Sequence, residues 1–170
     1  MRLYPAKISL IAADILRGLT QDGDIELEDR AEAEEDLCSV MREYLRQDRE
    51  ITERAKDRAE KIGAGNAEVH RIKRKMAEDL NFGLGGEAVS WILDQAVQML
   101  MRSSNVAEIF AEDPVLRRKM RAVLERYMNV DDEMDTEVRS RLKHLSEGTQ
   151  NWEVEYARVM EQIKRRHNVD

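Results

Sequence analysis

The sequence has little of what a disulfide-stapled, secreted or membrane-spanning protein needs. Cys38 is the single cysteine, so no disulfide can form within the chain and a secreted disulfide scaffold is excluded. The apolar stretch near the N-terminus, residues 8–13, is too short for the core of a signal peptide. No apolar run approaches the roughly 18 residues that a membrane span requires. We therefore expect a cytoplasmic protein that does not enter a membrane.

Chain breakers and aromatic residues are also scarce. The 170 residues include 8 glycines, 2 prolines and 5% aromatic residues, whereas 37% are charged and 42% are hydrophobic. Few breakers and many charges favour long amphipathic helices over a β fold with many turns. The sequence therefore predicts an all-α protein. Residues 25–29 could be extended, but their acidic side chains argue against a buried strand.

Basic residues are outnumbered by acidic ones. The chain has 28 Lys and Arg against 35 Asp and Glu, a net charge of -7. Such an acidic body repels phosphates, which disfavours a dedicated binder of duplex DNA or acidic membranes. The charges are nevertheless clustered, because residues 22–36 are strongly acidic whereas residues 71–75, 117–121 and 164–167 are basic.

One apolar pattern recurs in the two halves of the chain. Residues 8–19 carry apolar side chains at the i, i+3, i+4, i+7 spacing of a helix face, and residues 89–100 repeat this spacing. The later apolar stripes of the first half recur in the same order and at nearly the same separation. These later stripes lie at residues 37–45 and 51–62, and again at 120–128 and 134–145.

The recurrence indicates a tandem duplication of a roughly four-helix unit. We place the first helical repeat at residues 1–80, a linker at residues 81–87 and the second repeat at residues 88–170. The linker is too short for a flexible tether, so we expect the eight helices to pack into one bundle-like body about a pseudo-two-fold axis. The helix at residues 89–101 should be among the most buried.

No motif in the chain predicts an enzyme, a metal site or a cofactor. The acidic segment that starts at Asp22 lacks the glycine and the final glutamate of a calcium loop. The glycine cluster at residues 83–87 lacks the lysine and the preceding strand of a phosphate-binding loop. His70 and His144 lie beside apolar faces and are expected to be packed residues, and Cys38 is expected to be a buried, inert thiol. We predict no cofactor, no bound metal and no enzymatic activity.

Two groups of residues are candidates for contacts with a partner. The basic side chains at residues 71–75 lie off the apolar stripe of their helix, so they could contact phosphates, pair with the acidic segment 22–36 or stay solvated. We favour pairing or solvation. Two methionines lie off the stripe of residues 89–100, which indicates either a helix buried between the repeats or a Met-lined partner surface, and we favour burial. The candidate interaction residues are Arg71, Lys73, Arg74, Lys75, Arg117, Arg118, Lys119, Met99 and Met101.

These observations favour a non-enzymatic adaptor or assembly protein that works through helical surfaces. A protein partner or a homo-oligomer is the partner that we expect. The alternative is a nucleic-acid-associated protein that uses its basic helix faces, but the acidic balance of the chain makes this alternative weaker.

Three parts of the first half resemble a known family. They are MRLYPAKISLIAADIL at residues 1–16, DGDIE at 22–26 followed by ED at 28–29, and the helix around residues 40–45. These segments resemble a small bacterial family catalogued as domain of unknown function 507. The resemblance implies a cytoplasmic, helical protein of two-part construction and implies no catalytic residue. The second half departs furthest, with SSNVAE at residues 103–108 where the first half has DGDIE.

Overall fold

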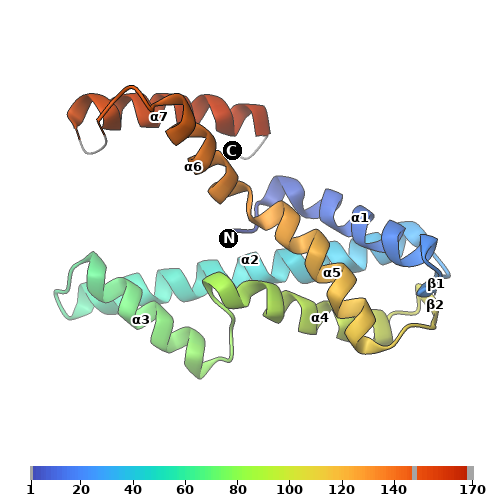
Figure 1. Ribbon diagram of the computed structural model, residues 1–170. Helices are drawn as coiled ribbons and strands as arrows, with labels where there is room; N and C mark the ends of the chain where they lie inside the picture. Colours follow the sequence, from blue (N-terminus) through green and yellow to red (C-terminus); the bar gives the residue numbers. More distant parts are fainter. Residues whose placement is uncertain (1, 147–148, 168–170) are drawn as a thin grey trace.

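Helices account for nearly all of the regular structure (Figure 1), so the all-α prediction is confirmed. The computed structural model describes residues 2–146 and 149–167, apart from the side chains of residues 131 and 132. In chain order the elements are a 3-10 turn η1 (Pro5–Lys7), α1 (Ile8–Gln21), β1 (Ile25–Leu27), α2 (Arg30–Lys61), α3 (Asn66–Asp79), a 3-10 turn η2 (Gly85–Glu87), α4 (Ala88–Arg102), β2 (Val106–Ile109), α5 (Asp113–Met128), α6 (Val130–Arg141) and α7 (Gln150–His167).

The main core lies in a head formed by α1, α4, α5 and the N-terminal part of α2. Both α1 and α4 contact α2 and α5, so the two halves of the chain share this core. The helical spacing places Ile11 and Leu16 of α1 and Ile92 of α4 on faces that point inward. Val97 and Leu100 are 3% and 1% exposed, which confirms the predicted burial of the helix at residues 89–101.

A short antiparallel ribbon closes the head at the end away from the chain termini (Figure 1). Ile25 lies opposite Ile109, and Leu27 lies opposite Val106. The alternation of a strand turns the Ile25 side chain into the core, where it is buried, while Glu26 faces solvent. The suggestion that residues 25–29 could be extended is therefore confirmed for residues 25–27, and this strand is buried only at Ile25.

Two helical hairpins project from the head as arms (Figure 1). The first arm consists of the C-terminal part of α2 and of α3, which pack against each other. Small side chains, Ala55 and Ala59 of α2 and Ala77 of α3, are buried and bring the two helices close together. The second arm consists of α6 and α7 and has a separate hydrophobic cluster that includes Val138 and Ile163.

The N-terminal segment joins the second arm to the head. Tyr4 is buried in the hydrophobic cluster of the second arm. The backbone N–H of Arg2 donates a hydrogen bond to the carbonyl oxygen of Met128, at 2.8 Å, near the start of this arm. The Lys7 ammonium donates to the carbonyl oxygen of His167, at 2.7 Å. The residues before α1 therefore contact the end of α5, the hydrophobic cluster of the second arm and the end of α7.

One expected helix boundary is absent. The stripes at residues 37–45 and 51–62 were expected to belong to separate helices, but both lie on α2, which runs without a break. Residues 46–50 contain no glycine or proline, and Arg46 pairs with Glu50 one turn later, at 3.0 Å. The expectation of eight helices is therefore wrong for the first half. In the second half, the chain does divide at Asn129, between α5 and α6.

Candidate binding cavity at the base of the first arm

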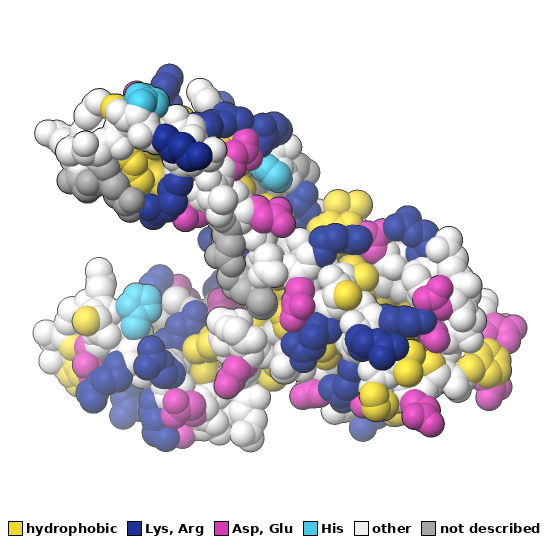
Figure 2. All heavy atoms as spheres, in the orientation of Figure 1, with side chains coloured by type: hydrophobic (Ala, Val, Ile, Leu, Met, Phe, Trp, Pro, Cys, Tyr) yellow, Lys and Arg dark blue, Asp and Glu magenta, His cyan; other side chains and the backbone are white. Residues whose placement is uncertain are grey.

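A cavity of about 920 Å³ lies where the first arm meets the head and the N-terminal segment. Figure 2 shows that the molecule is open on one side between the two arms. The cavity is lined from five places in the chain: the N-terminal segment, α2, α3, the region from η2 to the start of α4, and the end of α5. Its volume falls within the roughly 300–1,000 Å³ that is typical of ligand sites.

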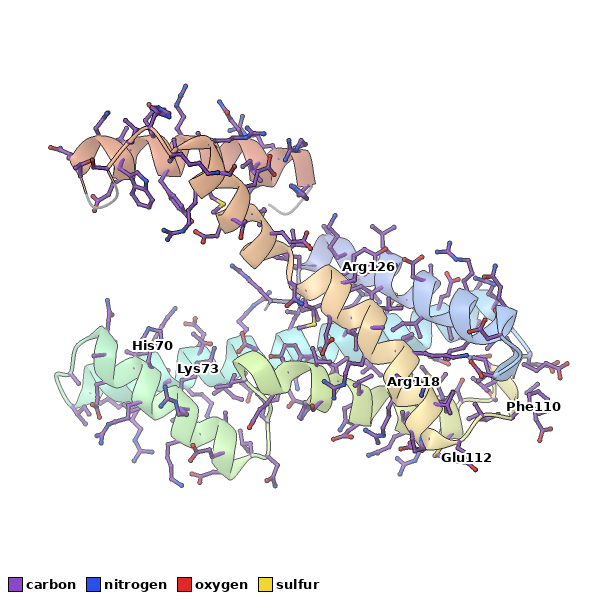
Figure 3. All side chains as sticks on the ribbon, in the orientation of Figure 1. His70, Lys73, Phe110, Glu112, Arg118 and Arg126 are labelled. Carbon is purple, nitrogen blue, oxygen red and sulfur yellow. The ribbon has the colours of Figure 1, made fainter. Side chains whose placement is uncertain are left out.

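The two helices of the first arm turn polar faces toward the cavity. Along α2 the lining residues Leu45, Asp48, Arg49 and Thr52 follow the i, i+3, i+4, i+7 spacing, which places them on one face. Along α3 the lining residues His70, Lys73 and Arg74 follow the same rule, and Figure 3 labels the first two on this helix. The polar walls therefore follow directly from helix periodicity.

The remaining lining includes an apolar group from the head. It consists of Leu3 of the N-terminal segment, Leu84 and Ala88 on either side of η2, and Met128 at the end of α5. Leu3, Ala88 and Met128 are almost fully buried, so their positions are set by the packing of the head. Leu84 is half-buried, so it is the part of this apolar floor that a ligand would meet beside the polar walls.

An aromatic cluster supports the wall that α2 provides. Tyr44 lines the cavity and stacks on Phe82, with ring centroids 4.9 Å apart, and Trp91 lies 5.5 Å from the Tyr44 ring. The Tyr44 hydroxyl donates a hydrogen bond to the carbonyl oxygen of Gly83, at 3.1 Å. Burial raises the pKa of Tyr44 well above its ordinary value, so the hydroxyl stays protonated and keeps this bond. These contacts fix the position of Tyr44 in the wall.

Cations outnumber acids in the lining. The two acids are already paired with lysines: Asp48 lies 2.8 Å from the Lys73 ammonium, and Glu53 lies 3.0 Å from the Lys56 ammonium. Three exposed arginines also line the cavity, and within residues 2–146 and 149–167 no described carboxylate forms an ion pair with any of them. We call them the cavity arginines: Arg2, Arg49 and Arg74.

Comparison with known proteins places the chain in a family. The model of the family described as "Protein of unknown function (DUF507)" matches residues 1–168. The chain belongs to this family. No protein among those with curated descriptions matches it. Membership of DUF507 confirms the resemblance seen in the N-terminal half and extends it over nearly the whole chain.

In this DUF507 chain the structure separates the basic residues at 71–75. Lys73 and Arg74 line the cavity, whereas Arg71 and Lys75 lie outside it. The Arg71 guanidinium donates to Glu68 at 3.0 Å, and the Lys75 ammonium donates to Asp79 at 2.8 Å. Ion pairing therefore satisfies most of this cluster, as favoured from the sequence. Pairing with the acidic segment 22–36, which was one expectation, is wrong. The partners are Asp48, farther along α2, and Glu68 and Asp79 of α3.

The basic residues at 117–119 lie on α5, away from the cavity. Arg117 pairs with Asp113, at 2.6 Å, and also with Asp94. Lys119 pairs with two acids of the segment 22–36, whose hydrogen bonds raise the pKa of Lys119. Arg118 is exposed on the outer side of α5 (Figure 3). This cluster joins α5 to its neighbours and presents a single guanidinium to solvent.

The remaining residues singled out from the sequence, two methionines, two histidines and the cysteine, differ in how far they are buried. Met99 is half-buried against the main core, whereas Met101 is 63% exposed, and neither lines the cavity. His70 and His144 are exposed, so the expectation that they are packed residues is wrong. Cys38 is buried, as predicted, and burial raises the pKa of its thiol.

Sequence reasoning missed Arg2 and Arg49 as residues of the site. Arg49 shares a helix face with Leu45 and Thr52, but nothing in that spacing says that the N-terminal segment packs nearby.

Among the residues that the structure describes, no group of three or more His, Cys, Asp or Glu side chains is arranged to hold a metal ion. Over the same part of the chain, no helix combines the length and the apolar character of a membrane span.

Proposed function

We propose that this protein is a non-enzymatic interaction protein that holds a segment of a protein partner in the cavity at the base of its first arm. The observation that carries the proposal is the composition of the cavity: an apolar floor beside walls that carry more cations than acids. In binding sites of this kind, apolar surface supplies affinity and a few polar groups set the orientation of the ligand.

The arms make a protein segment a better occupant than a small molecule. A stable protein interface buries roughly 800 Å² on each partner, so a protein segment would also contact surface outside the cavity. The helices of both arms extend beyond the cavity and would supply further contact area to a segment that leaves it.

We also propose a cytoplasmic location, since the single cysteine, Cys38, is a free thiol.

We infer that the arms are equivalent elements of a tandem duplication. The order of a 3-10 turn, a helix, a strand and a further helix occurs in both halves. In the register of the repeats, the loop residues Asp22 and Asp24 correspond to Ser103 and Asn105. Asp22 and Asp24 both pair with Lys119 of α5. Ser103 and Asn105 both donate hydrogen bonds to Asp36 of α2, at 2.6 and 2.9 Å. Lys119 and Asp36 are equivalent positions of the two second helices in the register of the repeats. This reciprocal arrangement supports a pseudo-two-fold relation.

The alternative of nucleic-acid binding through basic helix faces has weaker support. Arg71, Lys73 and Lys75 are each paired with a carboxylate, and the net charge of -7 repels phosphates. Binding to nucleic acid predicts a strong salt dependence and loss of binding when Lys73, Arg74 and Lys75 are all replaced by Glu.

Site-specific photo-crosslinking tests the proposed function. A photo-reactive phenylalanine analogue replaces Thr52, which lines the cavity, and a control chain carries the analogue at Ala122, which is exposed on α5 outside the cavity. We expect a protein adduct from position 52 and not from position 122. The purified partner should then bind the wild-type protein, with binding lost in Thr52→Trp, whose indole would project into the cavity, and kept in Ala122→Trp. Equal adducts from both positions, or full binding by Thr52→Trp, would refute the proposal.

A further inference from the structure

We propose that the cavity selects an acidic peptide segment with an apolar side chain beside its carboxylates, and that the cavity arginines Arg2, Arg49 and Arg74 bind those carboxylates. This inference rests on the proposed function, in which a segment of a protein partner occupies the cavity. It adds the chemistry of that segment and the residues that recognise it.

The first support is that all three arginines of one cavity lack an ion pair among the described side chains. Many arginines of the chain are held by nearby acids, as Arg46 is by Glu43 and Glu50. Arg118 also forms no ion pair with a described side chain, but it lies on α5 away from the cavity. The chain carries 35 acidic residues, so partners are abundant. Within the described part of the chain, the cavity arginines nevertheless keep their guanidinium groups out of ion pairs. Their side chains are therefore available to an anion from outside.

The second support is the way in which the cavity's own acids are used. Asp48 lies one residue from Arg49 in sequence, yet it pairs with Lys73 across the interface between α2 and α3. Glu53 pairs with Lys56 along α2. These acids are neutralised by lysines, so the cavity keeps the positive charge of its arginines.

The third support is the placement of the arginines on three different segments. Arg49 comes from α2, Arg74 from α3 and Arg2 from the N-terminal segment. Each guanidinium can bind a carboxylate through two parallel hydrogen bonds, which is the geometry that distinguishes arginine from lysine. A ligand with several carboxylates could be bound from more than one wall.

The apolar floor decides between an acidic peptide and a nucleic acid. The accessible apolar lining comes from Leu45 and Leu84, which are half-buried and carry no hydrogen-bonding side chain, so it matches an apolar side chain next to an acid. A nucleic-acid strand would place a phosphate in every unit and would also approach an acidic protein of net charge -7. A peptide that alternates acidic and apolar residues satisfies the walls and the floor together.

A binding assay with defined peptides tests the inference on the full-length protein. The probe is a short fluorescein-labelled peptide of alternating Glu and Leu, and the matched probe has Gln in place of Glu. Fluorescence anisotropy measures the affinity of each peptide for the wild-type protein, Arg49→Glu, Arg74→Glu and the control Arg118→Glu. The control makes the same charge change on an exposed arginine outside the cavity.

We expect the Glu peptide to bind the wild-type protein at least about tenfold more tightly than the Gln peptide, because each lost charge-assisted hydrogen bond weakens binding. Arg49→Glu and Arg74→Glu should each lower the affinity by about tenfold or more, and Arg118→Glu should leave it within about twofold. Arg74→Lys keeps the charge but loses the bidentate geometry, so its affinity should be intermediate.

Several outcomes would overturn the inference. They are failure of the Glu peptide to bind the wild-type protein, equal binding of the Glu and Gln peptides, equal binding by the wild-type protein and the two reversal variants, and tighter binding of a single-stranded oligonucleotide that the same reversals abolish. Thermal melting checks the fold of each variant; if a reversal lowers the melting temperature, the corresponding Arg→Gln variant replaces it in the same comparison. The proposed function is judged separately, by the adduct at position 52 and by Thr52→Trp.

Discussion

Replacing Gly83 by Ala should destabilise the protein, although alanine normally restricts an unfolded chain more than glycine does and so tends to stabilise. A Cβ atom at position 83 would lie 2.5 Å from the carbonyl oxygen of Glu87 and 2.9 Å from the Cβ of Trp91. Neither atom is the end of a flexible side chain, so η2 and the start of α4 would have to move. The reason for glycine here is close packing.

The expected cost has two parts. Forcing an extra carbon into a well-packed region costs about 1–3 kcal/mol. The shift would also strain the hydrogen bond from the Tyr44 hydroxyl to the Gly83 carbonyl oxygen, and losing such a bond costs about 0.5–1.5 kcal/mol. The free energy of unfolding should therefore fall by roughly 2–4 kcal/mol, which lowers the melting temperature by roughly 4–16 °C for a chain of this size.

A matched glycine gives the control. Gly18 lies within α1, and a Cβ added there meets nothing within 4 Å. Gly18→Ala should stabilise the protein by about 1 kcal/mol through helix propensity alone. Urea unfolding followed by circular dichroism measures both variants against the wild-type protein. If Gly83→Ala proves as stable as the wild type, or if both variants change stability in the same direction, the close packing of the Gly83 turn is refuted.

Three further predictions concern titratable groups. The pKa of Glu43 is lowered from 4.5 to about 2, chiefly by hydrogen bonds from Arg46. The ionised form is therefore favoured in the folded state, and its stabilisation is complete above about pH 4.5 and lost as the pH falls toward 2. Urea unfolding over this range should show a shallower loss of stability for Glu43→Gln, and an unchanged slope would contradict the prediction. The Cys38 thiol, buried and with a raised pKa, should react with a thiol reagent only as fast as the protein unfolds, so rapid labelling of the native protein would count against its burial. Lys119→Met should lower the urea midpoint because Asp24, which is 9% exposed, loses its cation, and adding Asp24→Asn should recover part of the loss; a midpoint equal to that of the wild type would show that the pair adds nothing.

The core of the head could be predicted from local patterns. The apolar stripes at residues 8–19 and 89–100 identified the faces of α1 and α4 that are buried. Helical periodicity is a property of a single segment, so it indicates an inward face without naming what packs there. The same reasoning predicted Cys38 as a buried residue.

Helix ends and the ribbon depended on the rest of the molecule. The stripes at residues 37–45 and 51–62 look like two helices in sequence, yet the polar residues between them favour helix as well, and α2 continues through them. Residues 25–27 become a strand because residues 106–109 lie beside them and supply the hydrogen bonds. Strand pairing between distant segments leaves little trace in either segment alone.

The candidate site shows the same division between what the sequence determines and what the tertiary structure decides. The sequence placed Lys73 and Arg74 together on the outward side of one helix. Only the packing of α2 against α3 decided that Lys73 pairs with Asp48 while Arg74 stays unpaired among the described side chains. Only the path of the N-terminal segment brought Arg2 to the same cavity. Periodicity determines the face on which a side chain lies, but which faces meet is decided by contacts between segments that are far apart in the chain.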